Sequence, residues 1–103
     1  MIIYNVTINV DHNEVDNWLD YMQNKHIQDV LNTGCFIEAR LSRVQAEEEG
    51  GKTYSVQYLC ESQAKLEEYQ NQHAPALQAE HTQKFAGKFA AFRTLLDIVE
   101  IKK

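Results

Sequence analysis

Residues 2–10 carry an apolar side chain at every second position: Ile2, Tyr4, Val6, Ile8 and Val10. Side chains of a β-strand point alternately to opposite faces, so these five residues form one apolar face. The residues between them, Ile3, Asn5, Thr7 and Asn9, form a second face that is mainly polar. The pattern predicts a strand that buries one face against a hydrophobic layer, and a fold must supply that layer.

A helical period follows directly. Apolar residues recur three and four positions apart between residues 13 and 32: Val15, Trp18, Leu19, Met22, Ile27, Val30 and Leu31. This spacing places them along one face of an amphipathic helix. Gly34 can adopt the left-handed conformation that ends many helices. We therefore predict a helix over about residues 13–32.

The rest of the chain repeats these two patterns. Residues 35–44 and 53–60 alternate again and flank a polar, glycine-containing turn, which is typical of an antiparallel hairpin. Ser62 can cap a second helix that ends near Gly87. Pro75 predicts a kink or a restart of this helix near Ala74, because proline lacks the backbone donor. Residues 92–101 are predicted to form a last strand.

The resulting order, β-α-β-β-α-β, predicts an α+β fold of the ferredoxin-like class. Such a fold has a four-stranded antiparallel sheet with two helices on one face. The chain of 103 residues contains 44% hydrophobic residues and one proline, which favours a single domain over residues 1–103 without a linker.

Charge and composition exclude several classes of partner. The net charge of −5 argues against nucleic acid, whose binding requires clustered lysine and arginine. Polar residues interrupt the apolar N-terminal segment, and no basic stretch precedes it, so we expect neither a signal peptide nor a membrane segment. The expected location is the cytoplasm, where Cys35 and Cys60 would stay reduced.

The sheet face without helices allows two interpretations. It is expected to be polar but weakly charged, and one side of an antiparallel sheet can simply be solvated. Alternatively, it packs against the same face of a second copy. Ile3, Leu59 and one apolar row of the last strand are expected on or near this face, and they favour a homodimer.

His26 raises the main functional question of the sequence. It lies four residues from both Met22 and Val30, so helical spacing turns it inward. It is a core histidine with a hydrogen-bond partner, a histidine whose ring reaches the surface, or a pocket residue. We predict a pocket for a small, mainly apolar molecule, closed by the second helix around Tyr69 and His73. The candidate binding residues are Tyr4, Trp18, Met22, His26, Tyr54, Tyr58, Tyr69 and His73.

Metal and disulfide sites are not expected. His73, Glu80 and His81 share the second helix, but the two histidines lie about 12 Å apart along a straight helix, too far for one ion. No metal and no cofactor are therefore predicted. The hairpin register leaves Cys35 roughly 10 Å from Cys60, so we predict free thiols.

Several segments resemble a known family: MIIYNVT at residues 1–7, TGCFIEAR at 33–40, GGKTYSVQY at 50–58 and FAGKFAAFRT at 85–94, together with Trp18 and His26. They resemble bacterial proteins of similar length that form a domain of unknown function. The order of elements also resembles the dimeric α+β barrel superfamily, which includes cofactor-free antibiotic-biosynthesis monooxygenases, dehalogenating and muconolactone-processing enzymes, and haem-binding members. This resemblance implies homodimerisation and a pocket between helices and sheet. It implies no reaction, because no catalytic motif of the superfamily maps onto these residues.

Three classes of function therefore stay open. The first, which we predict, is a small-molecule-binding homodimer without chemistry. The second is a cofactor-independent oxygenase or isomerase that uses His26 or His73 as general base. The third is a structural or interaction dimer whose pocket is filled core.

Overall fold

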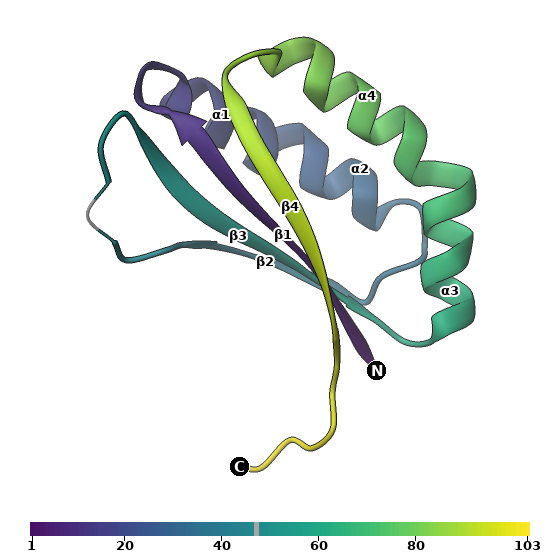
Figure 1. Ribbon diagram of the computed structural model, residues 1–103. Coiled ribbons are helices and arrows are strands. Elements are labelled where there is room, and N and C mark those ends of the chain that lie inside the picture. The colour runs from purple at the N-terminus through teal and green to yellow at the C-terminus, as the bar shows by residue number, and fades with distance from the viewer. Residues whose placement is uncertain (47) are drawn as a thin grey trace.

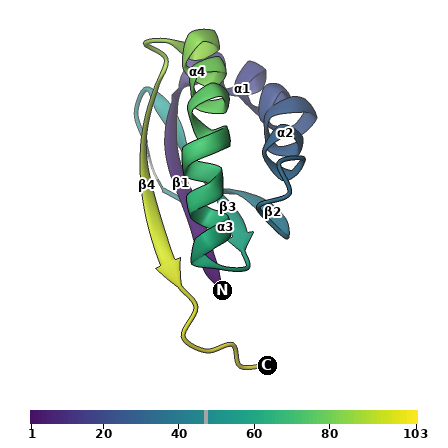
Figure 2. The same cartoon turned by 90° about the vertical axis from the view of Figure 1, so that its right-hand side faces the viewer.

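The computed structural model describes residues 1–46 and 48–103, and its centre is one antiparallel sheet. The strands are β1 (Ile2–Asp11), β2 (Glu38–Arg43), β3 (Gly51–Cys60) and β4 (Phe89–Asp97). Their order across the sheet is β2-β3-β1-β4. Both helical segments lie on the same side of this sheet (Figures 1 and 2). This is the predicted ferredoxin-like arrangement.

The first helical segment joins β1 to β2. It consists of η1 (His12–Glu14), α1 (Val15–Tyr21), η2 (Met22–His26) and α2 (Ile27–Leu31), in close agreement with the predicted range 13–32. The turn η2 is π-helical, because the N–H of Ile27 donates to the carbonyl of Met22, five residues earlier. Beyond the end of α2, Gly34 adopts a φ of 78°, as predicted for a helix stop.

The second helical segment joins β3 to β4. It consists of α3 (Gln63–Glu68), η3 (Tyr69–His73) and α4 (Ala74–Phe85). Ser62 caps α3, since its side-chain oxygen accepts the N–H of Lys65 at 3.2 Å. The turn η3 is again π-helical, and α4 starts at Ala74 with Pro75 in its first turn. The predicted cap and the predicted restart are both confirmed.

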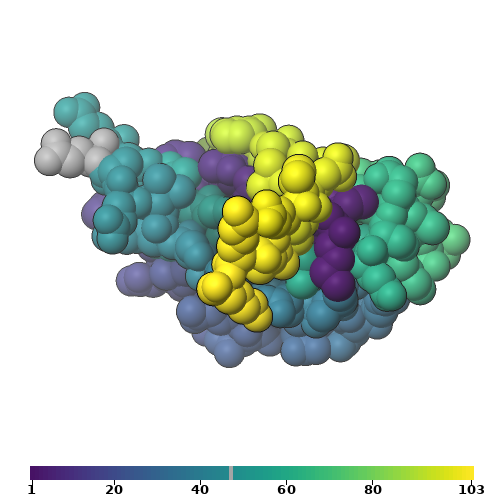
Figure 3. Space-filling view, turned by 90° about the horizontal axis from the view of Figure 1, so that it is seen from below, coloured from purple at the N-terminus to yellow at the C-terminus, as the bar shows by residue number. Residues whose placement is uncertain are grey.

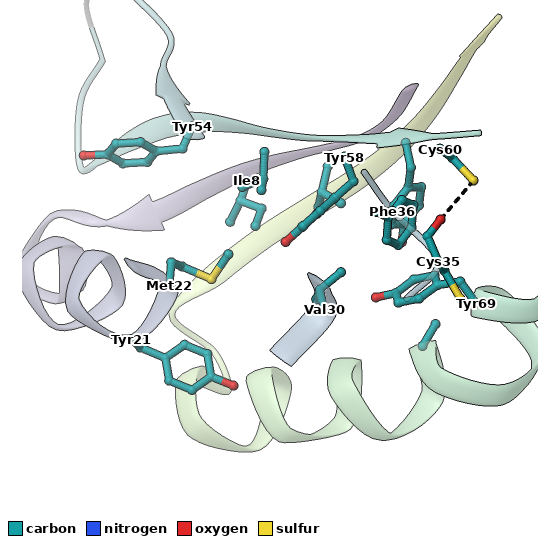
Figure 4. Packing of buried hydrophobic residues seen from close by; sticks show 14 of the residues in the cluster. Ile8, Tyr21, Met22, Val30, Cys35, Phe36, Tyr54, Tyr58, Cys60 and Tyr69 are labelled. Carbon is teal, nitrogen blue, oxygen red and sulfur yellow. Dashed lines mark hydrogen bonds between the residues drawn. The ribbon is translucent and has the colours of Figure 1, made fainter. Parts of the chain in front are cut away.

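The core fills the space between the sheet and the two helical segments. In β1 every second residue from Ile2 to Val10 is buried. Antiparallel pairing places the first four of these residues opposite buried residues of β3, such as Tyr58 opposite Tyr4. Trp18, Met22, Val30 and Leu66 close the core from the helical side. Figure 4 shows Met22, Val30 and Tyr69 directed toward Ile8, Tyr58 and Phe36.

Two boundaries differ from the prediction. The last strand covers Phe89–Asp97 instead of 92–101, because its only partner is β1 and the pairing ends where Asp97 opposes Ile2. Alternation was predicted from residue 35, but Ile37 is 52% exposed and Phe36 is buried, opposite to the order that continues into β2. The regular alternation of β2 begins only at Glu38, so the preceding residues follow the path of a loop.

Cys35 and Cys60 are both free, as predicted. The reason differs from the predicted one. The chain before β2 passes over the end of β3, so the Cys60 thiol lies 3.4 Å from the carbonyl oxygen of Cys35. The Cys35 sulfur points away from Cys60 (Figure 4), and it lies 3.1 Å from Oε2 of Glu68. The two residues are neighbours, and the direction of their side chains keeps the thiols apart.

No helix among the described residues is both long enough and apolar enough to cross a bilayer.

Candidate functional site

A cavity of about 50 Å³ lies between the sheet and the helices. A cavity needs about 10–15 Å³ to hold one water molecule, so this volume corresponds to about four water molecules. Its walls come from β1, β3, β4 and both helical segments: Tyr4, Val6, Ile8, Met22, His26, Val56, Tyr58, Tyr69, Gln78, His81, Thr82, Phe89, Ala91 and Arg93. The walls are mainly apolar, with a few polar groups at fixed positions, as in small-molecule sites.

The cavity adjoins an outer groove between β4 and the second helical segment. This groove has a volume of about 350 Å³, and Tyr4, Gln78 and Arg93 line both spaces. Arg93 lies opposite buried Val6, on the face of β4 that is turned toward the helices. Its Nε donates a hydrogen bond of 2.9 Å to the hydroxyl of Tyr4. The entrance therefore carries a cation that is held in place by a tyrosine of the cavity wall.

The hydrogen bonds around His26 define its neutral tautomer. Tyr21 donates its hydroxyl hydrogen to Glu80 at 3.1 Å, and the same hydroxyl lies 3.4 Å from Nδ1 of His26. A hydroxyl that has already donated its hydrogen can only accept, so Nδ1 of His26 carries the ring hydrogen. Nε2 of His26 is then left as an acceptor. Lys25 holds Glu80 from the solvent side at 2.9 Å.

His81 has the same tautomer as His26, but the other nitrogen of its ring is the one bonded by the protein. The indole N–H of Trp18 donates to Nε2 of His81 at 2.9 Å, so the ring hydrogen of His81 is on Nδ1. Among the described residues, no enclosed side-chain nitrogen or oxygen lacks a hydrogen-bond partner. The two ring nitrogens without a protein partner, Nε2 of His26 and Nδ1 of His81, therefore keep some accessible surface, and both residues line the cavity. One is an acceptor and the other is a donor.

Burial keeps both rings neutral. Desolvation lowers the pKa of His81 to about 4, and repulsion from the Arg93 charge and from a protonated His26 acts in the same direction. Desolvation also lowers the pKa of His26, against the opposing effects of Asp29 and Glu80. The two ring centroids lie 5.6 Å apart. At neutral pH the cavity thus contains two uncharged imidazoles side by side.

The tyrosines supply further donors. Burial raises the pKa values of Tyr58 and Tyr69 above the ordinary range. It also raises the pKa of Tyr21 to about 12, with a contribution from the charge of Glu80. All three hydroxyls are therefore protonated at neutral pH, and those of Tyr58 and Tyr69 belong to cavity residues.

The structure brings some of the candidate residues together and separates others. Five of them, Tyr4, Met22, His26, Tyr58 and Tyr69, line the cavity. Trp18 and Tyr54 do not; they pack behind the wall with ring centroids 5.0 Å apart. His73 also lies outside the lining, because the π-helical turn η3 directs it toward Glu68 and Cys35. His81 occupies the place that was expected for His73.

Besides His81, sequence reasoning missed Tyr21, Glu80 and Arg93. Tyr21 and Glu80 orient His26, yet helical spacing alone did not place Tyr21 in the core. Arg93 lies between Ala91 and Leu95 on the inward row of β4. A charged residue at an inward position of a strand is a detectable signal, and it becomes visible once the strand is placed correctly.

Comparison with known proteins agrees with this fold. The model of DUF4286, a domain of unknown function, matches residues 1–99. No curated protein matches the sequence.

Solved structures with low sequence identity share the fold over the whole chain. HapK from Hahella chejuensis has a TM-score of 0.74 at 11% identity, covering 100% of this chain and 97% of that chain. A dimeric ferredoxin-like protein from an uncultured marine organism has a TM-score of 0.72 at 14% identity, covering 100% and 99%. The heme-degrader MhuD from Mycobacterium tuberculosis, solved with two hemes in its active site, has a TM-score of 0.71 at 15% identity and full coverage of both chains. At such identities the likeness concerns the fold alone.

Proposed function

The chain belongs to the DUF4286 family, whose function is unknown, and we propose that it is a homodimeric binding protein for a small, mainly apolar molecule. The observation that carries this proposal is the cavity between sheet and helices. Its mainly apolar wall includes an imidazole acceptor and an imidazole donor that have no protein partner. A filled core would pair these groups with one another or with the backbone.

The wall chemistry defines the class of ligand. Nε2 of His26 suits a hydroxyl or N–H of the ligand, and Nδ1 of His81 suits an oxygen. Arg93 at the entrance suits a carboxylate or another anionic group. The volume of about 50 Å³ admits a fragment of few heavy atoms, with any larger part in the outer groove. We therefore propose a small aromatic or aliphatic acid or phenol as the ligand.

The π-helical turns support this position for the site. Each helical segment contains one such turn, and the first residue of each, Met22 and Tyr69, lines the cavity. A π-turn inserts an extra residue into a helix and is often found at functional sites, because it is retained despite its cost in regularity. Here both turns lie beside the same cavity.

The second copy is proposed to bind the open sheet face, defined by the outward residues of all four strands. Its centre is polar, where Asn5 bonds Thr7 and Ser55, and where Asn9 bonds Thr53. An apolar row lies beside it: Ile3, Leu59, Phe92 and Leu96, of which Phe92 is 62% exposed. A solvated face rarely keeps such a row, whereas a two-fold interface would bury it. The description of one fold neighbour as dimeric adds support.

The expected compartment is the cytoplasm, and the two unbridged cysteines support it.

The ligand proposal is tested with defined probes. We expect benzoate and phenol to give saturable shifts of cavity resonances in a ¹H–¹⁵N NMR titration, and benzylammonium to bind more weakly because Arg93 repels it. Ala91→Leu should fill the cavity and abolish these shifts, since Ala91 lies in its wall. Ala79→Leu, at an exposed position of α4, is the matched control and should bind like the parent protein. Shifts that persist in Ala91→Leu would contradict the proposal.

A further inference from the structure

Three potential metal ligands meet at the surface, away from the cavity proposed for the small molecule. The sulfur of Cys35, a carboxylate oxygen of Glu68 and an imidazole nitrogen of His73 all lie within 4.8 Å of one another. The closest pair is Cys35 Sγ and Glu68 Oε2, at 3.1 Å. Cys35 is buried, while Glu68 and His73 are half-buried, so an ion from solution can reach the cluster.

The π-helical turn η3 is the reason that two of these residues meet. Glu68 and His73 are five residues apart, and in an α-helix this spacing corresponds to about 140° of rotation around the axis. In a π-turn the hydrogen bonds join residues five apart, as the N–H of Ala74 does with the carbonyl of Tyr69. Residues at this spacing then lie one turn above each other. Cys35 reaches them from the loop before β2.

The donor set fits a divalent transition metal. Thiolate, carboxylate and imidazole bind Zn²⁺ at about 2.3, 2.1 and 2.0 Å, so donors around a tetrahedral ion lie roughly 3.5 Å apart. Small side-chain rotations from the present separations would reach this geometry. A Cys35 thiolate and the Glu68 carboxylate would also neutralise the two charges of the ion, so the occupied site would carry no net charge at a partly buried position.

The metal-free arrangement already orients two ligands toward each other. The Cys35 thiol donates to Oε2 of Glu68, while the other oxygen of the carboxylate faces Lys65 at 3.8 Å. Burial, followed by the contact with Glu68, raises the pKa of the Cys35 thiol. The contact with Cys35 and the charge of Lys65 lower the pKa of Glu68. An ion would replace the shared hydrogen and release it to solvent.

We propose that Cys35, Glu68 and His73 form a binding site for Zn²⁺ or a similar transition-metal ion, with water in the fourth position. The site is separate from the cavity. Tyr69 lies between them, because its ring contributes to the cavity wall and also stacks on His73 with ring centroids 6.4 Å apart. The metal proposal is therefore independent of the small-molecule proposal, and each can fail alone.

Cobalt provides the direct test, because a bound thiolate gives Co²⁺ a charge-transfer absorption in the near ultraviolet. We expect reduced, tag-free protein to bind one Co²⁺ per chain with this absorption, and Zn²⁺ to displace it. Cys35→Ser should remove the absorption. Glu68→Gln and His73→Gln should each weaken Co²⁺ binding at least about ten-fold, by loss of a direct ligand. Glu68→Gln alters a half-buried side chain, so this variant should fold even if Cys35→Ser does not.

Matched controls distinguish the cluster from other thiols and imidazoles. Cys60→Ala removes the second cysteine, and His12→Gln removes an exposed histidine of η1. Both variants should bind Co²⁺ like the parent protein. The proposal is overturned if the parent protein shows no thiolate absorption, if the absorption survives Cys35→Ser, or if Glu68→Gln and His73→Gln leave the affinity unchanged.

Discussion

At the scale of single residues, the two histidines of the cavity have different roles. His81 is buried and accepts the indole hydrogen of Trp18, which is fully buried. His26 is half-buried and makes a longer contact of 3.4 Å with Tyr21. His81 therefore contributes to the stability of the core, whereas His26 mainly presents a nitrogen to the cavity. Their truncations should separate these roles.

His81→Ala is expected to destabilise the protein more than His26→Ala. The first change leaves the Trp18 N–H without a partner in the core, which costs about 1–3 kcal/mol in addition to lost packing. The second leaves Tyr21 bonded to Glu80 and should cost less than about 1 kcal/mol. Urea denaturation at one fixed protein concentration, followed by the fluorescence of the single tryptophan, measures both.

Binding gives the complementary result. His26→Ala should weaken benzoate or phenol binding in the NMR titration while the fold persists. Equal losses of stability in His26→Ala and His81→Ala would mean that His26 is a core histidine.

The lowered pKa of His81 predicts a pH-dependent stability. In the unfolded chain the His81 imidazole binds a proton near pH 6.5, whereas in the folded protein it stays neutral until about pH 4. The contribution of His81 to the free energy of unfolding is therefore complete above pH 6.5 and is lost as the pH falls toward 4. The loss is about 3 kcal/mol, at 1.36 kcal/mol per pKa unit. His26, whose pKa is also lowered, adds to this trend, and the charges of His26 and Arg93 face His81.

The measurement is the free energy of unfolding between pH 4 and pH 7. His81→Phe should flatten the profile by the amount assigned to His81, while the exposed control His12→Gln should keep the slope of the parent protein. A profile that is identical in His81→Phe would contradict the neutral, buried state of this ring.

The sequence placed some of the residues that line the cavity and misplaced others for a physical reason. Tyr4 and Tyr58 occupy strand positions whose alternation is strict, so their inward direction follows from period two. His73 and His81 occupy a helix whose pitch changes at η3. A constant helical period cannot describe a segment with an inserted residue, and so it placed His73 on the same face as His81.

At the scale of secondary structure elements, boundaries with a local chemical signal were predicted well. Ser62, Pro75 and the glycines Gly34 and Gly87 each mark the end or restart of a helix by their own backbone chemistry. The limits of β4 depend instead on where β1 stops providing a partner. Such a limit is a property of the sheet, and the sequence of the strand does not contain it.

The Ser62 cap makes a quantitative prediction for α3. Ser62→Ala removes the acceptor of the Lys65 N–H and should lower the free energy of unfolding by about 1 kcal/mol. Ser62→Gly should lower the free energy of unfolding by only a few tenths of a kcal/mol, because glycine tolerates the cap position. Urea denaturation of both variants measures the difference. Equal losses in the two variants would show that the hydrogen bond contributes little.

At the scale of the whole molecule, the helices cover one face of the sheet, and the open face carries no helix. The chain end lies beside this sheet, where the N–H of Ile98 donates to the carbonyl of Met1 at 3.0 Å. Figure 3 shows the C-terminal residues next to the N-terminal ones at this end of the molecule. Beyond that contact, Val99 and Ile101 are 95% and 67% exposed. In the proposed dimer, a second copy would cover exposed apolar residues of the apolar row and of the chain end.

The dimer proposal predicts that charge on the open face separates the subunits. Ser55 and Gln57 lie on β3 at the centre of this face, where they oppose Thr7 and Asn5 of β1. Ser55→Glu combined with Gln57→Glu places two carboxylates per chain against the same carboxylates of the partner across a two-fold axis. Like charges that face each other in a desolvated interface cost several kcal/mol, which is enough to dissociate a modest dimer.

Light scattering after size exclusion measures the outcome. The parent protein is expected at twice the chain mass of 11.9 kDa, and the double variant at the chain mass, with an unchanged circular dichroism spectrum. The control is Gln23→Glu combined with Gln83→Glu, which adds the same charge at exposed positions of the helical segments and should remain dimeric. A parent protein that is monomeric at micromolar concentration would refute the dimer. If the test variant and the control variant both remain dimeric, the interface lies away from the open face. An interface on the open face would not tolerate the carboxylates at residues 55 and 57.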